Sequence, residues 1–234
     1  NQKVNSEYIY NSIVELQKQH EINIFSANSG LSTKGIDLGS RNIQSLKTPK
    51  AAMIIGNGVR SYEAGEVWHL LDTRVHMPIT KISLNYFDRI SIDKYNVLVM
   101  VSGNYKFNAK TIEKIKAWIS KGNTLITIGT ANNWIIKNKI VKEELVVKKK
   151  DTLNNKLDRR PYVDASENNG REKLGGVFLN VKIDKTHPIA FGYNDSDQVV
   201  YKNNLVWLKP SNNSYSNVAI YDDKPHVDGY ISKN

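Results

Sequence analysis

The sequence predicts an α/β protein with a mostly parallel sheet, and three observations lead to this class. From residue 51 onward, short apolar runs alternate with segments whose apolar residues recur at helical spacing. Hydrophobic residues make up 40% of the 234 residues, which is enough to bury an ordinary core. The longest apolar run covers only residues 97–101, far short of the roughly 18 to 20 residues that a membrane span needs. We therefore expect a soluble domain without a membrane span.

Four apolar runs are the candidate strands of this sheet. They cover residues 51–55, 79–84, 97–101 and 124–128. The unit at 95–128 is the clearest, because Asn108 is a typical N-cap residue and Gly122 is typical of the position just after a helix. Between these two positions, three apolar residues at helical spacing are expected to face the sheet, namely Ile112, Ile115 and Ile119.

A second helix is expected directly after the first strand, with Ser61 as its N-cap. Its apolar face is expected to consist of Ala64, Val67, Trp68 and Leu71. Helices that connect parallel strands cover the faces of the sheet. The expected fold is therefore a flavodoxin-like three-layer sandwich with a mostly parallel sheet.

The domain organisation predicted from the sequence has a boundary between residues 49 and 50. Residues 1–49 contain an amphipathic helix at 4–20, followed by a Gly- and Ser-rich connector with strand-like apolar pieces. Residues 50–234 then form the α/β domain. Because the sequence opens on Asn1 and closes just after Gly229, both ends are expected to be cuts from a longer protein.

The last third of the chain is expected to leave the parallel sheet and to return as strands. Residues 137–176 are polar and lack periodicity, and segment 159–164 within them suits either a partner-facing loop or an ordered surface excursion. Alternating apolar residues predict a strand at 177–183. Further strands that close the same domain are expected at 199–201, 205–208 and 218–221.

Composition excludes several classes of function. The chain has no cysteine, so disulfides, thiolate metal sites and a cysteine nucleophile are excluded. The net charge of +10 would suit nucleic-acid binding, but the lysines are spread along the chain, and the densest run, 148–150, is followed at once by Asp151. We therefore expect no nucleic-acid partner.

The loop between the first strand and the second helix is the first candidate binding site. Gly56 and Gly58 lie where a dinucleotide-binding fingerprint would begin, but its third glycine position holds serine, so a tight structural turn is favoured. The helix N-terminus with Arg60 could still bind an anion, whereas Glu63 and Glu66 in the same turns oppose this.

Two hydroxyl residues follow the third and fourth strands. Ser102 and Thr130 are expected at the carboxyl edge of the sheet, where open α/β sheets bind ligands. Neither lies in a G-x-S-x-G elbow, so they are interpreted as turn residues. The alternative is a hydrolase, which requires His69 or another histidine within hydrogen-bonding distance. His69 and Asp72 also have the spacing of two metal ligands, but no third ligand is evident.

Five segments together resemble a known family. They are 58–74 (GVRSYEAGEVWHLLDTR), 160–162 (RPY), 175–176 (GG), 186–188 (THP) and 229–231 (GYI). This set is similar to the C-terminal region of Bacteroidetes-type zinc carboxypeptidases, in which a carboxypeptidase A-like catalytic domain precedes a class I glutamine amidotransferase-like domain. The resemblance covers nearly all of residues 20–234.

The resemblance implies a non-catalytic accessory domain of an exported peptidase, secreted or periplasmic, with the upstream catalytic domain as its partner. The zinc ligands would belong to that upstream domain, so no cofactor and no metal site are expected in this chain. The amidotransferase cysteine would fall near 129–131, which has no cysteine. Two alternatives are a small-molecule or carbohydrate binding module that uses the crevice near Gly56, Arg60, Ser102 and Thr130, and a residual serine or threonine hydrolase.

Overall fold

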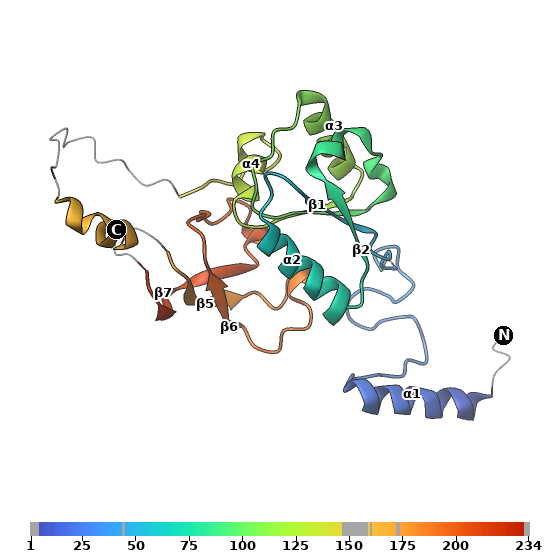
Figure 1. Ribbon diagram of the computed structural model, residues 1–234. Coiled ribbons are helices and arrows are strands. Elements are labelled where there is room, and N and C mark those ends of the chain that lie inside the picture. The colour runs from blue at the N-terminus through green and yellow to red at the C-terminus, as the bar shows by residue number, and fades with distance from the viewer. Residues whose placement is uncertain (1–4, 44, 147–158, 160, 172–173, 232–234) are drawn as a thin grey trace. The chain divides into compact units, whose positions relative to one another are not determined.

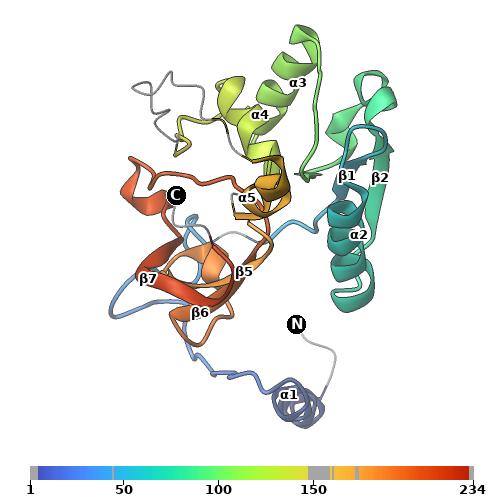
Figure 2. The same cartoon turned by 60° about the vertical axis from the view of Figure 1, so that its left-hand side comes forward.

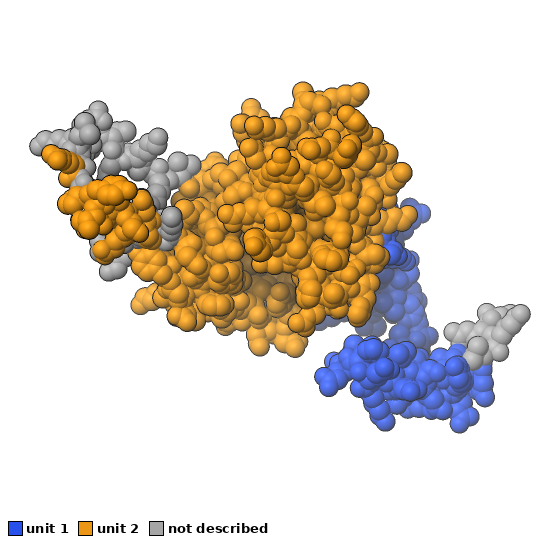
Figure 3. All heavy atoms as spheres, viewed as in Figure 1, with its two compact units in different colours: residues 1–48 blue, residues 49–234 orange. Residues whose placement is uncertain are grey.

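The structure is a computed structural model that describes residues 5–43, 45–146, 159, 161–171 and 174–231. The chain divides into two compact units, Asn1–Thr48 and Pro49–Asn234, which Figure 3 distinguishes by colour. That the first unit leads out of an upstream domain stays a prediction. Within the described residues, no helix combines the length and the apolar character needed to cross a bilayer.

Among its described residues, the first unit contains one helix, α1 (Ser6–His20). Asn5 caps it, because its side-chain oxygen accepts a hydrogen bond of 3.0 Å from the Glu7 N–H. The prediction of strand-like segments after this helix is wrong, since no strand is found in the described part of residues 21–50. This segment instead forms local turns, for example a bond of 2.9 Å from the Leu38 N–H to the Gly30 carbonyl.

The second unit is built on a four-stranded parallel sheet, as the sequence predicts. Its strands are β1 (Ala51–Ile55), β2 (Ile79–Ser83), β3 (Val97–Met100) and β4 (Thr124–Thr127). They lie in the order β2-β1-β3-β4, and every neighbouring pair is parallel. Figure 1 shows helices around this sheet.

Alternating residues of β1, and of β3 with the residue that follows it, face two separate hydrophobic clusters. One cluster contains Ala52, Ile54, Leu98 and Met100 together with buried residues of α3 (Ala109–Ser120) and α4 (Ala131–Lys137). The other contains Ala51, Met53, Val99 and Val101 together with Ala64 of α2 (Ser61–His69). Since successive side chains of a strand point to opposite faces, the helices cover both faces of the sheet.

The helix that connects β3 with β4 forms as the sequence predicts. The Asn108 side chain accepts a hydrogen bond of 2.8 Å from the Thr111 N–H and so caps α3. Ile115 is fully buried, whereas Ile112 and Ile119 are partly buried against the same cluster. Gly122 follows the helix with φ 88°, the left-handed conformation that ends many helices.

Two expectations for α2 are wrong. The N-cap position belongs to Arg60, not to Ser61, because the Arg60 backbone is still extended and its N–H donates to the Ser102 carbonyl at 2.9 Å. Trp68 does not belong to the buried face, since 41% of it is exposed and the Lys81 Nζ lies 3.8 Å from its ring centroid. A π-helical segment, Leu70–Arg74, continues α2.

A second, antiparallel sheet follows the parallel one (Figure 2). Its strands are β5 (Val177–Ile183), β6 (Asp197–Lys202) and β7 (Ala219–Gly229), in the order β6-β5-β7. These strands confirm the predictions at 177–183, 199–201 and 218–221. The prediction of a strand at 205–208 is wrong, because among the described residues this loop makes only an isolated β-bridge, between Leu145 and Leu208.

In its described part, the excursion before the antiparallel sheet contains one α-helix, α5 (Ala165–Arg171). Short 3₁₀ turns occupy Leu84–Arg89, Ile92–Lys94, Tyr162–Asp164, Pro188–Ala190 and Ser214–Ser216. Residues 147–158 and Arg160, which belong to the expected excursion and to its candidate partner-facing loop, lie outside the described residues.

Candidate functional site

The loops that follow β1, β3 and β4 meet at the carboxyl edge of the parallel sheet, as expected for Ser102 and Thr130. Backbone hydrogen bonds connect the first two loops. The Arg60 N–H donates to the Ser102 carbonyl at 2.9 Å, and the Asn104 N–H donates to the Gly58 carbonyl at 2.8 Å. Neighbouring parallel strands thus bring three loops that are distant in sequence into one place.

The carboxylate of Glu63 lies inside this group of loops, with only 13% of its side chain exposed. Its Oε2 accepts a hydrogen bond of 2.9 Å from the Ser102 N–H. Its Oε1 lies 3.8 Å from the guanidinium of Arg60, whose side chain is 69% exposed, so this ion pair contributes little. Glu63, placed by the first turn of α2, therefore serves as an acceptor for the loop after β3.

Tyr105 lies next to this carboxylate. Its hydroxyl donates to the Val101 carbonyl at 2.6 Å, and the side chain is buried. Burial raises the pKa of the Tyr105 phenol far above its ordinary value, and the negative charge of Glu63 raises it further. The phenol therefore stays protonated and neutral at physiological pH.

The hydroxyl groups of Ser102 and Thr130 bind each other's loops. The Ser102 Oγ accepts a hydrogen bond of 3.0 Å from the Thr130 N–H, and the Thr130 Oγ1 accepts one of 3.1 Å from the Gly103 N–H. Ser102 is buried. None of the hydrogen bonds that the structure gives these hydroxyls involves a histidine, and His69 is exposed near the end of α2.

Gly129 fits between these groups because it has no side chain. Its φ is 58°, in the left-handed region, and a Cβ built on it would overlap the Ser102 Oγ and come within 3.5 Å of the Glu63 Oε2. We call the set Glu63, Ser102, Gly103, Gly129 and Thr130 the strand-end network. Its polar atoms bond to one another, which makes it a compact, cross-linked junction.

The other predicted site residues separate into two places. Gly56 and Gly58 form a tight turn with positive φ, closed by a bond of 3.0 Å from the Val59 N–H to the Gly56 carbonyl. Arg60, Glu63 and Glu66 line a hollow of about 420 Å³ beside the start of α2, together with Val59, Ser61, Tyr62 and Asn203. Two carboxylates and one guanidinium disfavour an anionic ligand there.

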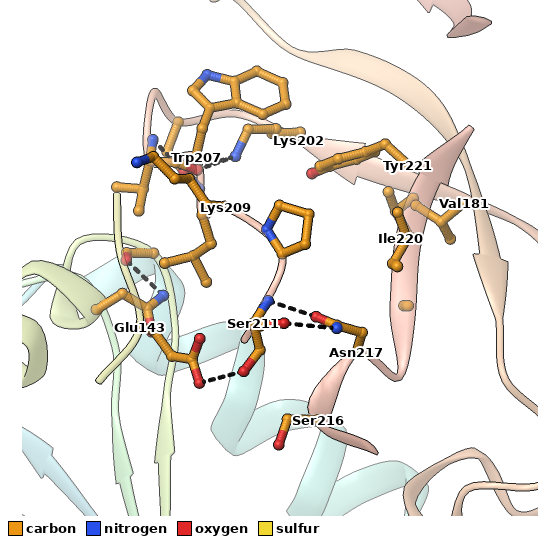
Figure 4. Close-up of a pocket in the computed structure, with 18 of the residues that line it drawn as sticks. Glu143, Val181, Lys202, Trp207, Lys209, Ser211, Ser216, Asn217, Ile220 and Tyr221 are labelled. Carbon is orange, nitrogen blue, oxygen red and sulfur yellow. Dashed lines mark hydrogen bonds between the residues drawn. The ribbon is translucent and has the colours of Figure 1, made fainter. Parts of the chain in front are cut away.

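A larger pocket of about 740 Å³ adjoins the strand-end network. It lies between the start of α4 and the antiparallel sheet, and Gly129 belongs to both the network and the pocket wall. Figure 4 shows its labelled side chains in two groups. Trp207, Lys202 and Tyr221 gather on one side, and Glu143, Ser211, Ser216 and Asn217 gather on the other.

The first group combines two aromatic rings with a buried cation. The rings of Trp207 and Tyr221 are tilted at 58° with their centroids 5.4 Å apart. Lys202 is only 8% exposed, and its Nζ lies 4.3 Å from the Trp207 ring centroid. This Nζ donates to the Val206 carbonyl at 2.7 Å and to the Asn204 Oδ1 at 3.2 Å. Burial lowers the pKa of Lys202 and raises that of Tyr221.

The second group is tied together by polar contacts. The Ser211 Oγ donates to the Glu143 Oε1 at 2.9 Å, and the Ser211 N–H donates to the Asn217 Oδ1 at 2.7 Å. The Asn217 Nδ2 in turn donates to the Ser211 carbonyl at 3.1 Å. These bonds connect Glu143, Ser211 and Asn217 within one part of the pocket wall.

Sequence reasoning assigned no function to Lys202, Trp207 or Tyr221. One signal was available, because Trp207 is a large aromatic residue in a loop flanked by Asn204 and Ser211, and functional residues are common on such loops. The rest of the pocket depends on the pairing of β5 with β6 and β7, which no local pattern specifies.

The spacing of His69 and Asp72 does not lead to a metal centre among the described residues. Both side chains are exposed, and no group of three or more His, Asp or Glu side chains in the described part of the chain is arranged to hold a metal ion.

Comparisons of the chain with protein-family models, with curated proteins and with solved structures give no significant match. The resemblance of residues 58–74 and the four shorter segments to zinc carboxypeptidases therefore stays a prediction. The strand-end network and the adjoining pocket are the features of the second unit that bear on its function.

Proposed function

We propose that residues 49–234 form a flavodoxin-like accessory domain without catalytic activity. The strand order β2-β1-β3-β4 supports this proposal, because flavodoxin-like sheets begin with the order 2-1-3-4. Together with the resemblance of residues 58–74, it favours a class I glutamine amidotransferase-like domain that has lost its chemistry.

The strand-end network carries the proposal. A serine or threonine nucleophile must pass its proton to a base within hydrogen-bonding distance, and that base is usually a histidine. Here the Ser102 Oγ and the Thr130 Oγ1 accept backbone N–H groups, and the Glu63 carboxylate accepts the Ser102 N–H. These groups are engaged in joining three loops, which is a structural role.

The parent activity that we propose is metal-dependent peptide hydrolysis by an upstream carboxypeptidase domain of the same protein. It rests on the resemblance alone, as do export and the absence of zinc from this chain. In this setting the domain would stabilise or orient the catalytic domain, or would supply a ligand-binding surface.

The test is an assay of the purified chain with carboxypeptidase peptides, p-nitrophenyl acetate and glutamine, together with its zinc content by mass spectrometry. We expect no turnover above the buffer blank and no stoichiometric zinc. The variants Ser102→Ala and Thr130→Val serve as controls for the two hydroxyls. Turnover that either variant abolishes would show a hydrolase and overturn the proposal.

A second function, binding of a small molecule, is favoured by a specific observation. The predicted crevice is occupied by its own hydrogen bonds, but the neighbouring pocket of about 740 Å³ has the size of a small-molecule site. We propose this pocket, in place of the crevice near Gly56 and Ser102, as the site of that function.

A further inference from the structure

We propose that the pocket between the start of α4 and the antiparallel sheet binds a short neutral saccharide. The inference rests on the small-molecule function proposed above and names its ligand class. Three properties of the pocket carry it: an aromatic wall, an opposite wall of hydrogen-bonding groups, and charged groups that balance in number, since Lys202 and Lys209 are matched by Glu143 and Glu144.

The aromatic wall consists of Trp207 and Tyr221, with Ile220, Val181 and Pro210 among the other apolar residues that line the pocket. Aromatic rings carry negative charge on their faces and positive charge at their edges. The C–H bonds of a sugar ring are weakly positive, so a sugar packs well against such a face. A tryptophan and a tyrosine at 5.4 Å provide a broad surface for this contact.

The opposite wall offers amide, hydroxyl and carboxylate groups. Asn217, Ser211, Ser216 and Glu143 gather on the side of the pocket away from Trp207 (Figure 4). A carboxylate has about four acceptor positions, and only one contact to the Glu143 carboxylate, from the Ser211 hydroxyl, is seen among the described residues. Sugar hydroxyls both donate and accept hydrogen bonds, so they suit this mixed set of groups.

The charged groups of the pocket favour a neutral ligand over an anion or a cation. Lys209 forms an ion pair of 2.7 Å with Glu144. The Lys202 ammonium points to the Val206 carbonyl and the Asn204 amide beneath the Trp207 ring, and burial lowers its pKa. A neutral ligand avoids the large desolvation energy that a charged ligand would need to recover, and the hydration that sugar hydroxyls lose is replaced by hydrogen bonds to the pocket wall.

The pocket is also held in shape before a ligand arrives. The Val146 N–H donates to the Trp207 carbonyl at 2.8 Å, and the Lys209 N–H donates to the Glu144 carbonyl at 2.9 Å. Together with the Ser211–Asn217 bonds, these contacts fix the loop that carries Trp207. A preorganised site loses less conformational entropy on binding than a loop that must become ordered.

The experiment is saturation-transfer difference NMR of the whole chain with three probes: maltotriose, cellotriose and N,N′,N″-triacetylchitotriose. Each is used at up to about 10 mM, above the millimolar dissociation constants that weak complexes show. We expect saturation transfer to at least one probe, and calorimetry on that probe should show an affinity about tenfold lower for Trp207→Ala. Trp68→Phe, which changes an exposed tryptophan of α2, is the matched control and should bind like the wild type.

A second variant tests the pocket independently of whether Trp207→Ala folds. Ser216→Trp places a large side chain at an exposed position of the pocket wall and should block binding without removing core packing. Circular dichroism and thermal unfolding check that each variant is folded.

Three results would overturn the inference. The first is that no saturation is transferred to any of the three probes. The second is that folded Trp207→Ala and Ser216→Trp still bind the probe with wild-type affinity. The third is that the protein binds N-acetylphenylalanine, an anion, but no saccharide. Hydrolysis of a bound saccharide would contradict the non-catalytic role alone, since binding would remain. The two proposals therefore fail separately.

Discussion

Gly129→Ala is expected to destabilise the second unit by disrupting the strand-end network. An L-residue in the left-handed region loses about 1–2 kcal/mol relative to glycine. The added Cβ would also overlap the Ser102 Oγ, which accepts the Thr130 N–H. Displacing that hydroxyl leaves a partly buried N–H without its acceptor, which costs about 1–3 kcal/mol. The expected loss in the free energy of unfolding is therefore about 2–5 kcal/mol.

Urea denaturation followed by circular dichroism measures this loss, and Gly122→Ala is the matched control. Gly122 also has positive φ, at 88°, but a Cβ there would meet no atom within 4 Å. The control should therefore show only the backbone strain of about 1–2 kcal/mol. In a Ser102→Ala background, the additional loss from Gly129→Ala should fall to the same value, since the overlapping oxygen is gone. Equal losses for the two glycine variants, or an unchanged loss in the Ser102→Ala background, would refute the reasoning.

Three further predictions concern neighbouring interactions. Glu63→Ala should lower the free energy of unfolding, measured by urea denaturation, by about 1–3 kcal/mol because the Ser102 N–H loses its acceptor. Glu63→Gln keeps an acceptor oxygen and should lower it by less. Equal losses for the two variants would contradict this role of Glu63. Asn108→Ala should remove the cap of α3 and about 1 kcal/mol of stability, with Asn133→Ala at an exposed position of α4 as the comparison. Burial lowers the pKa of Lys202, so between that lowered pKa and the ordinary lysine value the unfolded state binds more protons than the folded state. The free energy of unfolding should therefore rise with pH in this window, and Lys202→Met should remove the rise. Parallel pH profiles of the free energy of unfolding for the two proteins would argue against this role of Lys202.

Much of the parallel sheet could be predicted because its signals are local. The runs at 51–55, 79–84, 97–101 and 124–128 read as strands from their apolar residues, and all four form. Asn108 and Gly122 marked the ends of α3 through capping chemistry that acts over three or four residues. The same local logic failed at Ser61, because α2 begins one residue earlier, with Arg60 as its N-cap, and the Arg60 N–H is bonded to the Ser102 carbonyl in the loop after β3.

The sequence also indicated that Ser102 and Thr130 would lie at the carboxyl edge of the sheet, since residues after parallel strands collect there. It did not show that these hydroxyls accept backbone N–H groups from each other's loops. That pattern depends on the register of β3 against β4 and on the absence of a Cβ at Gly129, and both are visible only when the strands are paired.

Composition and periodicity by themselves determined the α/β class, the parallel strands, the caps of α3 and the exclusion of cysteine chemistry. These properties depend on residues that are close in sequence or on residue types that are missing altogether. The tertiary structure alone decided that Glu63 supports the loop after β3, and that Trp207 and Tyr221 form one wall of a pocket with Lys202. The physical reason is that the Glu63–Ser102 bond joins residues 39 positions apart, and that the geometry of the pocket follows from strand pairing and packing, which no short pattern in the chain encodes.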